Sequence, residues 1–216
     1  MKEIEGLRYG DLSPAEIEKK SFEMIREELD KRGIVLEEDK APVVMRAIHT
    51  TADLDYACNL CFSENAVDEI TEAIRSGFPI VTDTQMARSG INMSRLKNFG
   101  CSVFCYMQDE DIARESAGTG RTRAYLSMDK AAGLGDGTVF VIGNAPTALI
   151  RLYELVREEG LKPGGIIGVP VGFVNVTEAK ELIMTLDCPY IVAKGKKGGS
   201  NVAAAIINAL VIRALG

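Results

Sequence analysis

The second half of the chain alternates short apolar runs with helical stretches, and this alternation constrains the fold more than any other feature. The runs lie at residues 79–83, 102–107, 138–143, 165–171 and 189–194. They are largely apolar at both alternating sets of positions, which is typical of strands covered on both faces of a parallel sheet. The pattern therefore predicts an α/β fold built on a doubly wound, parallel, five-stranded sheet.

The first part of the chain is expected to be mainly helical. Residues 13–16 form a capping box with proline at the first helical position, and apolar residues follow near helical spacing up to Gly33. Further helices are predicted at 42–53 and 65–77. We expect one domain over residues 1–216, in which 1–77 is a mainly helical extension and 78–216 is the alternating core.

Composition excludes several classes of protein. Hydrophobic residues make up 46% and charged residues 26%, as in soluble globular proteins. The net charge of −6 gives no indication of nucleic-acid binding. The apolar run at 202–212 is shorter than the roughly 20 residues that a bilayer span needs, so it predicts a buried or interface helix and no membrane segment. An odd number of cysteines without a secretory signal favours a cytoplasmic protein.

Cys58 and Cys61 form a CxxC motif, which can be half of a metal or redox site or can simply pack in a helix. No second CxxC exists and His49 is the only histidine. We therefore favour packing and expect no metal site.

Ligands of open α/β sheets bind beyond the carboxyl ends of the strands, so the residues after each run are candidate ligand contacts. Asp83 and Arg88 follow the first run, Asn144 follows the third, and Pro170 and Gly172 follow the fourth.

The segment KGKKGGSNVAAA after the fifth run is the most informative of these. Gly198, Gly199 and Ser200 open a helix directly after a strand, and Lys196 and Lys197 add positive charge. This combination favours anion binding over a solvated turn whose lysines aid solubility. The spacing is not that of a P-loop and no GxGxxG follows the first strand, so nucleotide binding is not supported.

Residue evidence alone leaves two positions open. Arg121 and Arg123 alternate near the start of a helical stretch, where they can form a solvated face or hold carboxylates. His49 can be structural, as a lone histidine often is, or can exchange protons near neutral pH.

Six segments occur in an order that spans nearly the whole chain. They are SFEMIREE (21–28), RAIHTTADLDYA (46–57), ITEAIRSGFPIVTDTQMARSGI (70–91), GNAPTAL (143–149), GVPVGFVN (168–175) and KKGGSNVAAAIINAL (196–210). Together they are specific, and the chain resembles the precorrin-8X methylmutases of cobalamin biosynthesis, including the cobalt-precorrin-8 methylmutases of the anaerobic route.

The resemblance implies an isomerase that moves a methyl group from C-11 to C-12 of a corrin macrocycle. The product would be hydrogenobyrinate, or cobyrinate when the substrate already contains cobalt. The resemblance also implies a flavodoxin-like fold, no external cofactor, and a homodimer with the pocket near the subunit interface.

The family's histidine falls on His49, whose implied role is to protonate or hydrogen-bond the macrocycle near the migrating methyl group. The substrate carries many carboxylates, so an acidic protein needs local positive groups to bind it. This chain has Lys196 where the family usually has arginine. Lysine keeps the positive charge but cannot form the two parallel hydrogen bonds of a guanidinium to a carboxylate. The candidate substrate contacts are Ser21, Thr50, Thr51, Asp83, Arg88, Arg121, Arg123, Asn144, Pro170, Gly172, Lys196, Lys197, Gly198, Gly199 and Ser200.

The alternative is a non-catalytic, flavodoxin-like protein that binds FMN or carries a tetrapyrrole. A yellow protein on purification would favour flavin binding, whereas a carrier would bind substrate and product without interconverting them.

Overall fold

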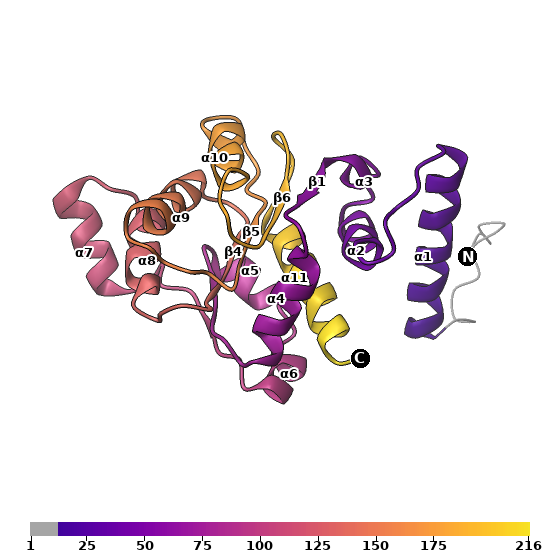
Figure 1. Cartoon of the computed structure of the whole chain (residues 1–216), viewed down its shortest axis with the longest axis horizontal. Coiled ribbons are helices and arrows are strands. Elements are labelled where there is room, and N and C mark those ends of the chain that lie inside the picture. The colour runs from indigo at the N-terminus through magenta and orange to yellow at the C-terminus, as the bar shows by residue number, and fades with distance from the viewer. Residues whose placement is uncertain (1–12) are drawn as a thin grey trace, which may run out of the picture.

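The computed structural model describes residues 13–216, and a six-stranded sheet forms its centre (Figure 1). The strand order is β1-β6-β5-β4-β2-β3. Strands β2 to β6 are mutually parallel, whereas β1 pairs antiparallel with β6, with Cys61 opposite Val192. The strands are β1 (Leu60–Phe62), β2 (Ile80–Thr82), β3 (Val103–Phe104), β4 (Val139–Ile142), β5 (Gly165–Gly168) and β6 (Tyr190–Ala193).

The five predicted strands are all present, each inside its apolar run. Taken alone they have the order 2-1-3-4-5 of flavodoxin-like sheets, which confirms the doubly wound prediction. The strand count was wrong by one, because β1 was not predicted. Three residues are too few to display a strand periodicity. Cys61 consequently lies in a strand and not in a helix, and only Cys58 lies in the short helix α3 (Tyr56–Asn59).

Alternating side chains of the strands face two separate apolar layers. Val139 and Val141 of β4 belong to one buried cluster, whereas Phe140 and Ile142 belong to the other. The first cluster is completed by α2 (Ala41–Thr51), α4 (Ala66–Arg75) and α11 (Ser200–Ala214). The second is completed by α8 (Arg123–Ala132), α9 (Pro146–Glu158) and α10 (Val176–Ile183). Coverage of both faces explains why the strands are largely apolar at both alternating sets of positions.

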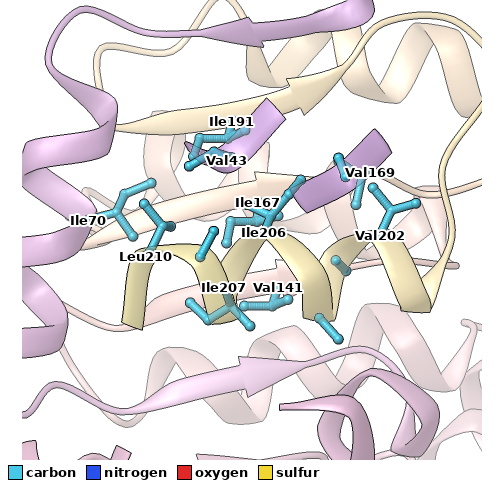
Figure 2. Close-up of a cluster of buried hydrophobic side chains, with 14 of the residues drawn as sticks. Val43, Ile70, Val141, Ile167, Val169, Ile191, Val202, Ile206, Ile207 and Leu210 are labelled. Atoms are coloured by element: carbon cyan, nitrogen blue, oxygen red, sulfur yellow. The ribbon is translucent and has the colours of Figure 1, made fainter. Parts of the chain in front are cut away.

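Helix α11 lies along one face of the sheet (Figure 2). Val202, Ile206 and Leu210 lie beside strand residues such as Ile167 in that view, and all of them are buried in the same cluster. The apolar run at 202–212 therefore forms a helix buried within its own chain, which is one of the two predicted alternatives. Between residues 13 and 216, no helix has the length and apolarity to cross a bilayer.

The N-terminal helix α1 (Pro14–Lys31) begins at the predicted capping box, in which the backbone N–H of Ser13 donates to the Glu16 carboxylate at 2.7 Å. It lies on the outer side of α2, at the end of the molecule (Figure 1). Gly33 follows the helix with a φ of 67°, as the predicted stop signal requires.

Two of the helical stretches between the apolar runs are each interrupted. Residues 85–97 form α5 (Gln85–Gly90), α6 (Met93–Leu96) and a 3-10 turn, η1 (Lys97–Phe99), because Ile91 is extended and Asn92 caps a new helix. Residues 109–132 form α7 (Glu110–Thr119) and α8, separated by Gly120 at φ 73° and the N-cap Thr122.

Candidate active site

A pocket of about 390 Å³ lies where α2, the α5–α6 turn and α11 meet. His49 and Thr50 enter it from the last turn of α2, which is the position the sequence predicted to be functional. The wall opposite α2 comes from Asn201, Ala204, Ala205 and Asn208 of α11, and the remaining lining residues are Arg46, Gly90, Asn92, Arg95 and Ile212.

The His49 side chain is exposed, so the structural alternative of a buried histidine does not hold. Its ring stacks on Phe22 of α1, with 5.1 Å between the ring centroids and an interplanar angle of 29°. Within residues 13–216 the imidazole makes no hydrogen bond to the protein, so its nitrogens are accessible to a ligand. The His49 ring is held in place by its helix and by stacking on Phe22, and its nitrogens are free. This arrangement suits acid–base chemistry on a bound molecule.

The neighbours of His49 shape the end of α2. The Thr51 hydroxyl donates to the Ala47 carbonyl at 2.8 Å and accepts from the Asp53 backbone N–H at 3.2 Å. Ala52 then leaves the helix with a φ of 54°. Thr51 and Asp53 therefore fix the backbone after His49, whereas Thr50 is exposed in the pocket.

Arg95, Asn201 and Asn208 line the pocket but were missed in the sequence. Asn201 and Asn208 are two polar residues seven positions apart in a mainly apolar helix, and this spacing places them on one helix face. This spacing could have been read from the sequence as a polar face, although it does not by itself indicate a pocket. The Asn208 side chain accepts from the Asn92 backbone N–H and donates to the Gly90 carbonyl, both at 2.8 Å, and so holds the turn before Arg95.

A second group of residues, which includes the predicted Asp83, Asn144 and Ser200, meets at the carboxyl ends of β2 and β4, where the strand order reverses. The Thr84 and Ser200 hydroxyl oxygens are 2.8 Å apart. A side chain at Gly143 would come within 2.6 Å of the Ser200 Cα atom, so the start of α11 abuts the loop after β4. The ends of β2 and β4 thus lie beside the start of the last helix.

Asp83 is fully buried at this junction. Its carboxylate accepts from the backbone N–H groups of Gly143, Asn144 and Ala145 at 2.7 to 2.9 Å. Burial raises the pKa of Asp83, and the three N–H groups oppose that rise. Sequence reasoning placed Asp83 among the substrate contacts, whereas its oxygens are already occupied by the loop that it shapes.

The loop after β6 lies between β6 and α11. The Lys197 ammonium contacts the carboxylates of Asp53 and Asp55, each at 2.6 Å. These carboxylates raise the pKa of Lys197, and Lys197 lowers the pKa of Asp53. Lys197 therefore links this loop to the end of α2 and brings little uncompensated charge, whereas Lys196 lies over the Phe173 ring at 5.0 Å.

The remaining predicted residues are more scattered. The Ser21 hydroxyl donates to the Ile17 carbonyl within α1, and Arg88 Nε donates to the Val103 carbonyl. Pro170 is buried, and the Gly172 N–H donates to the Lys196 carbonyl at 3.1 Å. Arg121 and Arg123 lie at the α7–α8 turn, on the far side of the sheet from α2 (Figure 1), so one chain does not bring them beside His49.

Metal ligation finds no support in the described part of the chain. Residues 13–216 contain no cluster of three or more histidine, cysteine or acidic side chains that could hold an ion. All five cysteines are unpaired, including Cys58 and Cys61.

Comparison with known proteins identifies the family. Residues 16–213 match the precorrin-8X methylmutase family. A cobalt-precorrin-8 methylmutase from Leptospira interrogans is 44% identical over 91% of this chain and 92% of its own length. A precorrin-8X methylmutase from Pseudomonas aeruginosa is 36% identical over 90% of this chain and 93% of its own. The crystal structure of precorrin-8X methylmutase from Thermus thermophilus superposes with a TM-score of 0.85 at 38% identity, covering 92% of this chain and 95% of that one. The chain therefore belongs to the precorrin-8X methylmutase family.

Proposed function

We propose that the protein moves a methyl group from C-11 to C-12 of cobalt-precorrin-8, giving cobyrinate, with precorrin-8 and hydrogenobyrinate as the cobalt-free pair. Membership of the methylmutase family supports this reaction. The cobalt form is favoured because the Leptospira relative named for it is 44% identical, against 36% for the Pseudomonas relative named for precorrin-8X. The alternative of a non-catalytic FMN or tetrapyrrole carrier is not favoured, since these relatives are named as mutases.

The observation that carries the proposal is the exposed imidazole of His49 in a pocket between three helical elements. In the reaction the bond from the methyl carbon to C-11 breaks as its bond to C-12 forms, so no group enters or leaves. His49 would donate a proton or a hydrogen bond to the macrocycle as its electrons redistribute, which lowers the energy of the transition state.

The carboxylates of the substrate need positive partners. Arg46 and Arg95 line the pocket beside His49, and both were absent from the predicted set. Arg46 already pairs with the Glu18 carboxylate of α1, so Arg95 is the stronger candidate. Lys196 and the backbone N–H groups of Gly198 and Ser200 would bind further carboxylates at the start of α11. Val171 and Phe173 are exposed on the loop after β5 and offer apolar surface to the flat face of the macrocycle.

The surroundings of the remaining predicted contacts suggest different roles for them. Thr50 is proposed to contact substrate, and the Asn144 side chain is exposed and accessible to it. We propose that a further six residues shape the backbone around the substrate-binding site and do not contact the substrate: Ser21, Thr51, Asp83, Arg88, Pro170 and Gly172. Arg121 and Arg123 would reach the substrate only if a second subunit brings them there.

A homodimer and a cytoplasmic location complete the proposal. Both rest on the resemblance and the composition, since most of α11 is buried within its own chain. Light scattering of the purified protein should give twice the mass of 23.4 kDa. A mass of one chain at micromolar concentration would remove the dimer from the proposal.

The direct test is separate incubation with cobalt-precorrin-8 and precorrin-8, followed by absorbance spectra. His49→Ala should lower turnover by about 10²- to 10⁴-fold, as loss of a general acid does, while still binding the coloured product. Glu158→Ala is the control, because Glu158 is exposed at the end of α9 and lies outside the pocket, so this variant should keep wild-type activity. Near-normal turnover of His49→Ala would remove His49 from the mechanism, and a yellow, flavin-containing preparation would favour the carrier.

A further inference from the structure

A buried lysine that the mechanism does not use lies beneath the loop after β6. Lys180 of α10 has 0% of its surface exposed. Its ammonium reaches out of the helix to the carbonyl oxygens of Gly195 at 2.7 Å and Lys197 at 2.8 Å. A buried ammonium is costly unless it is hydrogen-bonded, so these two carbonyls are what make its position tolerable. Burial lowers the pKa of Lys180 to about 8, while the carbonyl oxygens favour the charged form.

The hydrogen bonds of Lys180 fix the orientation of two peptide units of the loop. In a planar trans peptide the C=O and the following N–H point in opposite directions. Because the carbonyls of Gly195 and Lys197 point to Lys180, the N–H groups of Lys196 and Gly198 point away from it. Within residues 13–216, these two N–H groups have no protein acceptor.

Two further bonds hold the same loop from its other side. The Gly172 N–H donates to the Lys196 carbonyl at 3.1 Å, and the Gly199 N–H donates to the Val169 carbonyl at 2.8 Å. The carbonyls of three consecutive residues, 195 to 197, are thereby all consumed inside the protein. What the loop presents outward is a set of N–H donors beside Lys196 and the first turn of α11.

We propose that Lys180 is a positioning residue for the carboxylate-binding backbone of this enzyme, holding the 195–198 peptide units so that their N–H groups face a carboxylate of the corrinoid. This rests on the proposed function, since it assigns an origin to the anion site at the start of α11. Lys180 touches no substrate itself and acts through the loop.

The test compares three variants with the wild type. Lys180→Met keeps the side-chain length and removes the N–H donors. Lys180→Arg keeps the positive charge and the capacity to donate to both carbonyls. Leu152→Ala is the control, because it opens a cavity in the apolar cluster of α8, α9 and α10. Kinetics with cobalt-precorrin-8 and absorbance titration with the product give KM, kcat and the product Kd.

Lys180→Met should raise KM and the product Kd by about tenfold or more while kcat changes by less than about twofold, because ground-state binding is lost and the acid is intact. Lys180→Arg should recover part of the affinity. Leu152→Ala should leave both constants unchanged at a temperature where it is folded. A folded Lys180→Met with wild-type KM and Kd, or with kcat alone reduced, would overturn the proposal.

Amide hydrogen exchange separates failure of this proposal from failure of the proposed function. Lys180→Met should selectively accelerate exchange of the two hydrogen-bonded amides that hold this loop, those of Gly172 and Gly199, whatever reaction the wild type catalyses. Lys180→Arg carries the measurement if the methionine variant does not fold. Unchanged exchange there would remove Lys180 as the anchor. Absence of wild-type turnover with both corrinoids, in contrast, would count against the proposed function alone.

Discussion

Two loops at the carboxyl ends of the strands are held by buried side chains of opposite charge. The loop after β4 is held by a buried anion, Asp83, which accepts from three backbone N–H groups of residues 143–145. The loop after β6 is held by a buried cation, Lys180, which donates to the backbone carbonyls of Gly195 and Lys197. Each anchor comes from outside its loop, and both loops abut the start of α11.

The charge of the buried anchor determines which backbone hydrogen-bonding groups of each loop remain available to a ligand. Asp83 consumes N–H donors, so the loop after β4 loses the groups that would bind an anion. Lys180 consumes acceptors, so the loop after β6 keeps its donors outward. An anionic substrate is therefore expected to bind the backbone N–H groups of the loop after β6, whereas the loop after β4 can offer it only side chains such as Asn144.

Removal of the anionic anchor gives the largest expected effect. Asp83→Ala leaves three backbone N–H groups without their acceptor, at about 1–3 kcal/mol each, so the free energy of unfolding should fall by roughly 3 kcal/mol or more. Chemical denaturation measures this, with Asp83→Asn as an intermediate variant that keeps one acceptor. If Asp83→Ala unfolds at the wild-type midpoint, the loop after β4 does not depend on its anchor and the comparison fails.

The close approach of Gly198 to the neighbouring loop gives the next effect. A Cβ atom at this position would lie 2.1 Å from the Val169 carbonyl oxygen, which is backbone and cannot turn aside. Gly198→Ala should therefore cost about 1–3 kcal/mol of stability, as overpacking does, and weaken product binding. Gly195→Ala is the control in the same loop, since no atom lies within 4 Å of its added Cβ, although its φ of 80° adds some strain. Equal product binding by both variants would contradict the close-packed geometry of the loop.

Loss of the cationic anchor should cost less stability, because Lys180→Met also removes the penalty of a buried charge. We expect about 1–2 kcal/mol at pH 7, from two carbonyls left without a donor. The pKa of Lys180 falls from 10.5 in the unfolded chain to about 8 in the fold, so the unfolded state binds more protons between these values. The wild type should therefore gain stability relative to Lys180→Met as pH rises from about 8 to about 10.5. A stability difference that is flat across this window would show that the lysine titrates normally.

The ion pairs of Lys197 give the smallest effect. Asp53→Asn removes one partner of a partly exposed pair, which is worth at most about 1 kcal/mol. The pKa of Asp53 lies below its unfolded value of 3.8, so its contribution is present above that value and is lost as pH falls through the lower folded pKa. Stability of the wild type and Asp53→Asn should converge under acid. Asp68→Asn removes a 2.6 Å contact to Arg213 elsewhere and is the matched control, with no effect expected on product binding.

Much of the fold could be predicted because it depends on local patterns. The five short apolar runs, the capping box at Ser13 and the glycine-rich start of α11 are each contained within a few consecutive residues. Strand β1 could not be predicted in the same way, since it is defined by its pairing with β6, about 130 residues later in the chain.

The two anchors show where reasoning from the sequence ended. A lysine in a helix is usually solvated, yet Val176, Ala179, Lys180 and Ile183 have helical spacing on one buried face, so burial of Lys180 was implied by its neighbours. Asp83 was recognised as important from its place after a strand, but its partners are backbone N–H groups, which leave no trace in residue identity. His49 was singled out by the family resemblance, and its contact with Phe22 depends on a tertiary arrangement that spacing does not encode.

Strand β1 has a consequence for how the protein behaves at high concentration. Its three residues cover β6, whose Tyr190–Ala193 run is apolar and would otherwise present an open row of backbone donors and acceptors. At the opposite edge, β3 has only two residues. Short terminal strands give another chain little to pair with, so the sheet is protected from edge-to-edge aggregation. Protein in which β1 detaches should be the form that seeds intermolecular strand pairing.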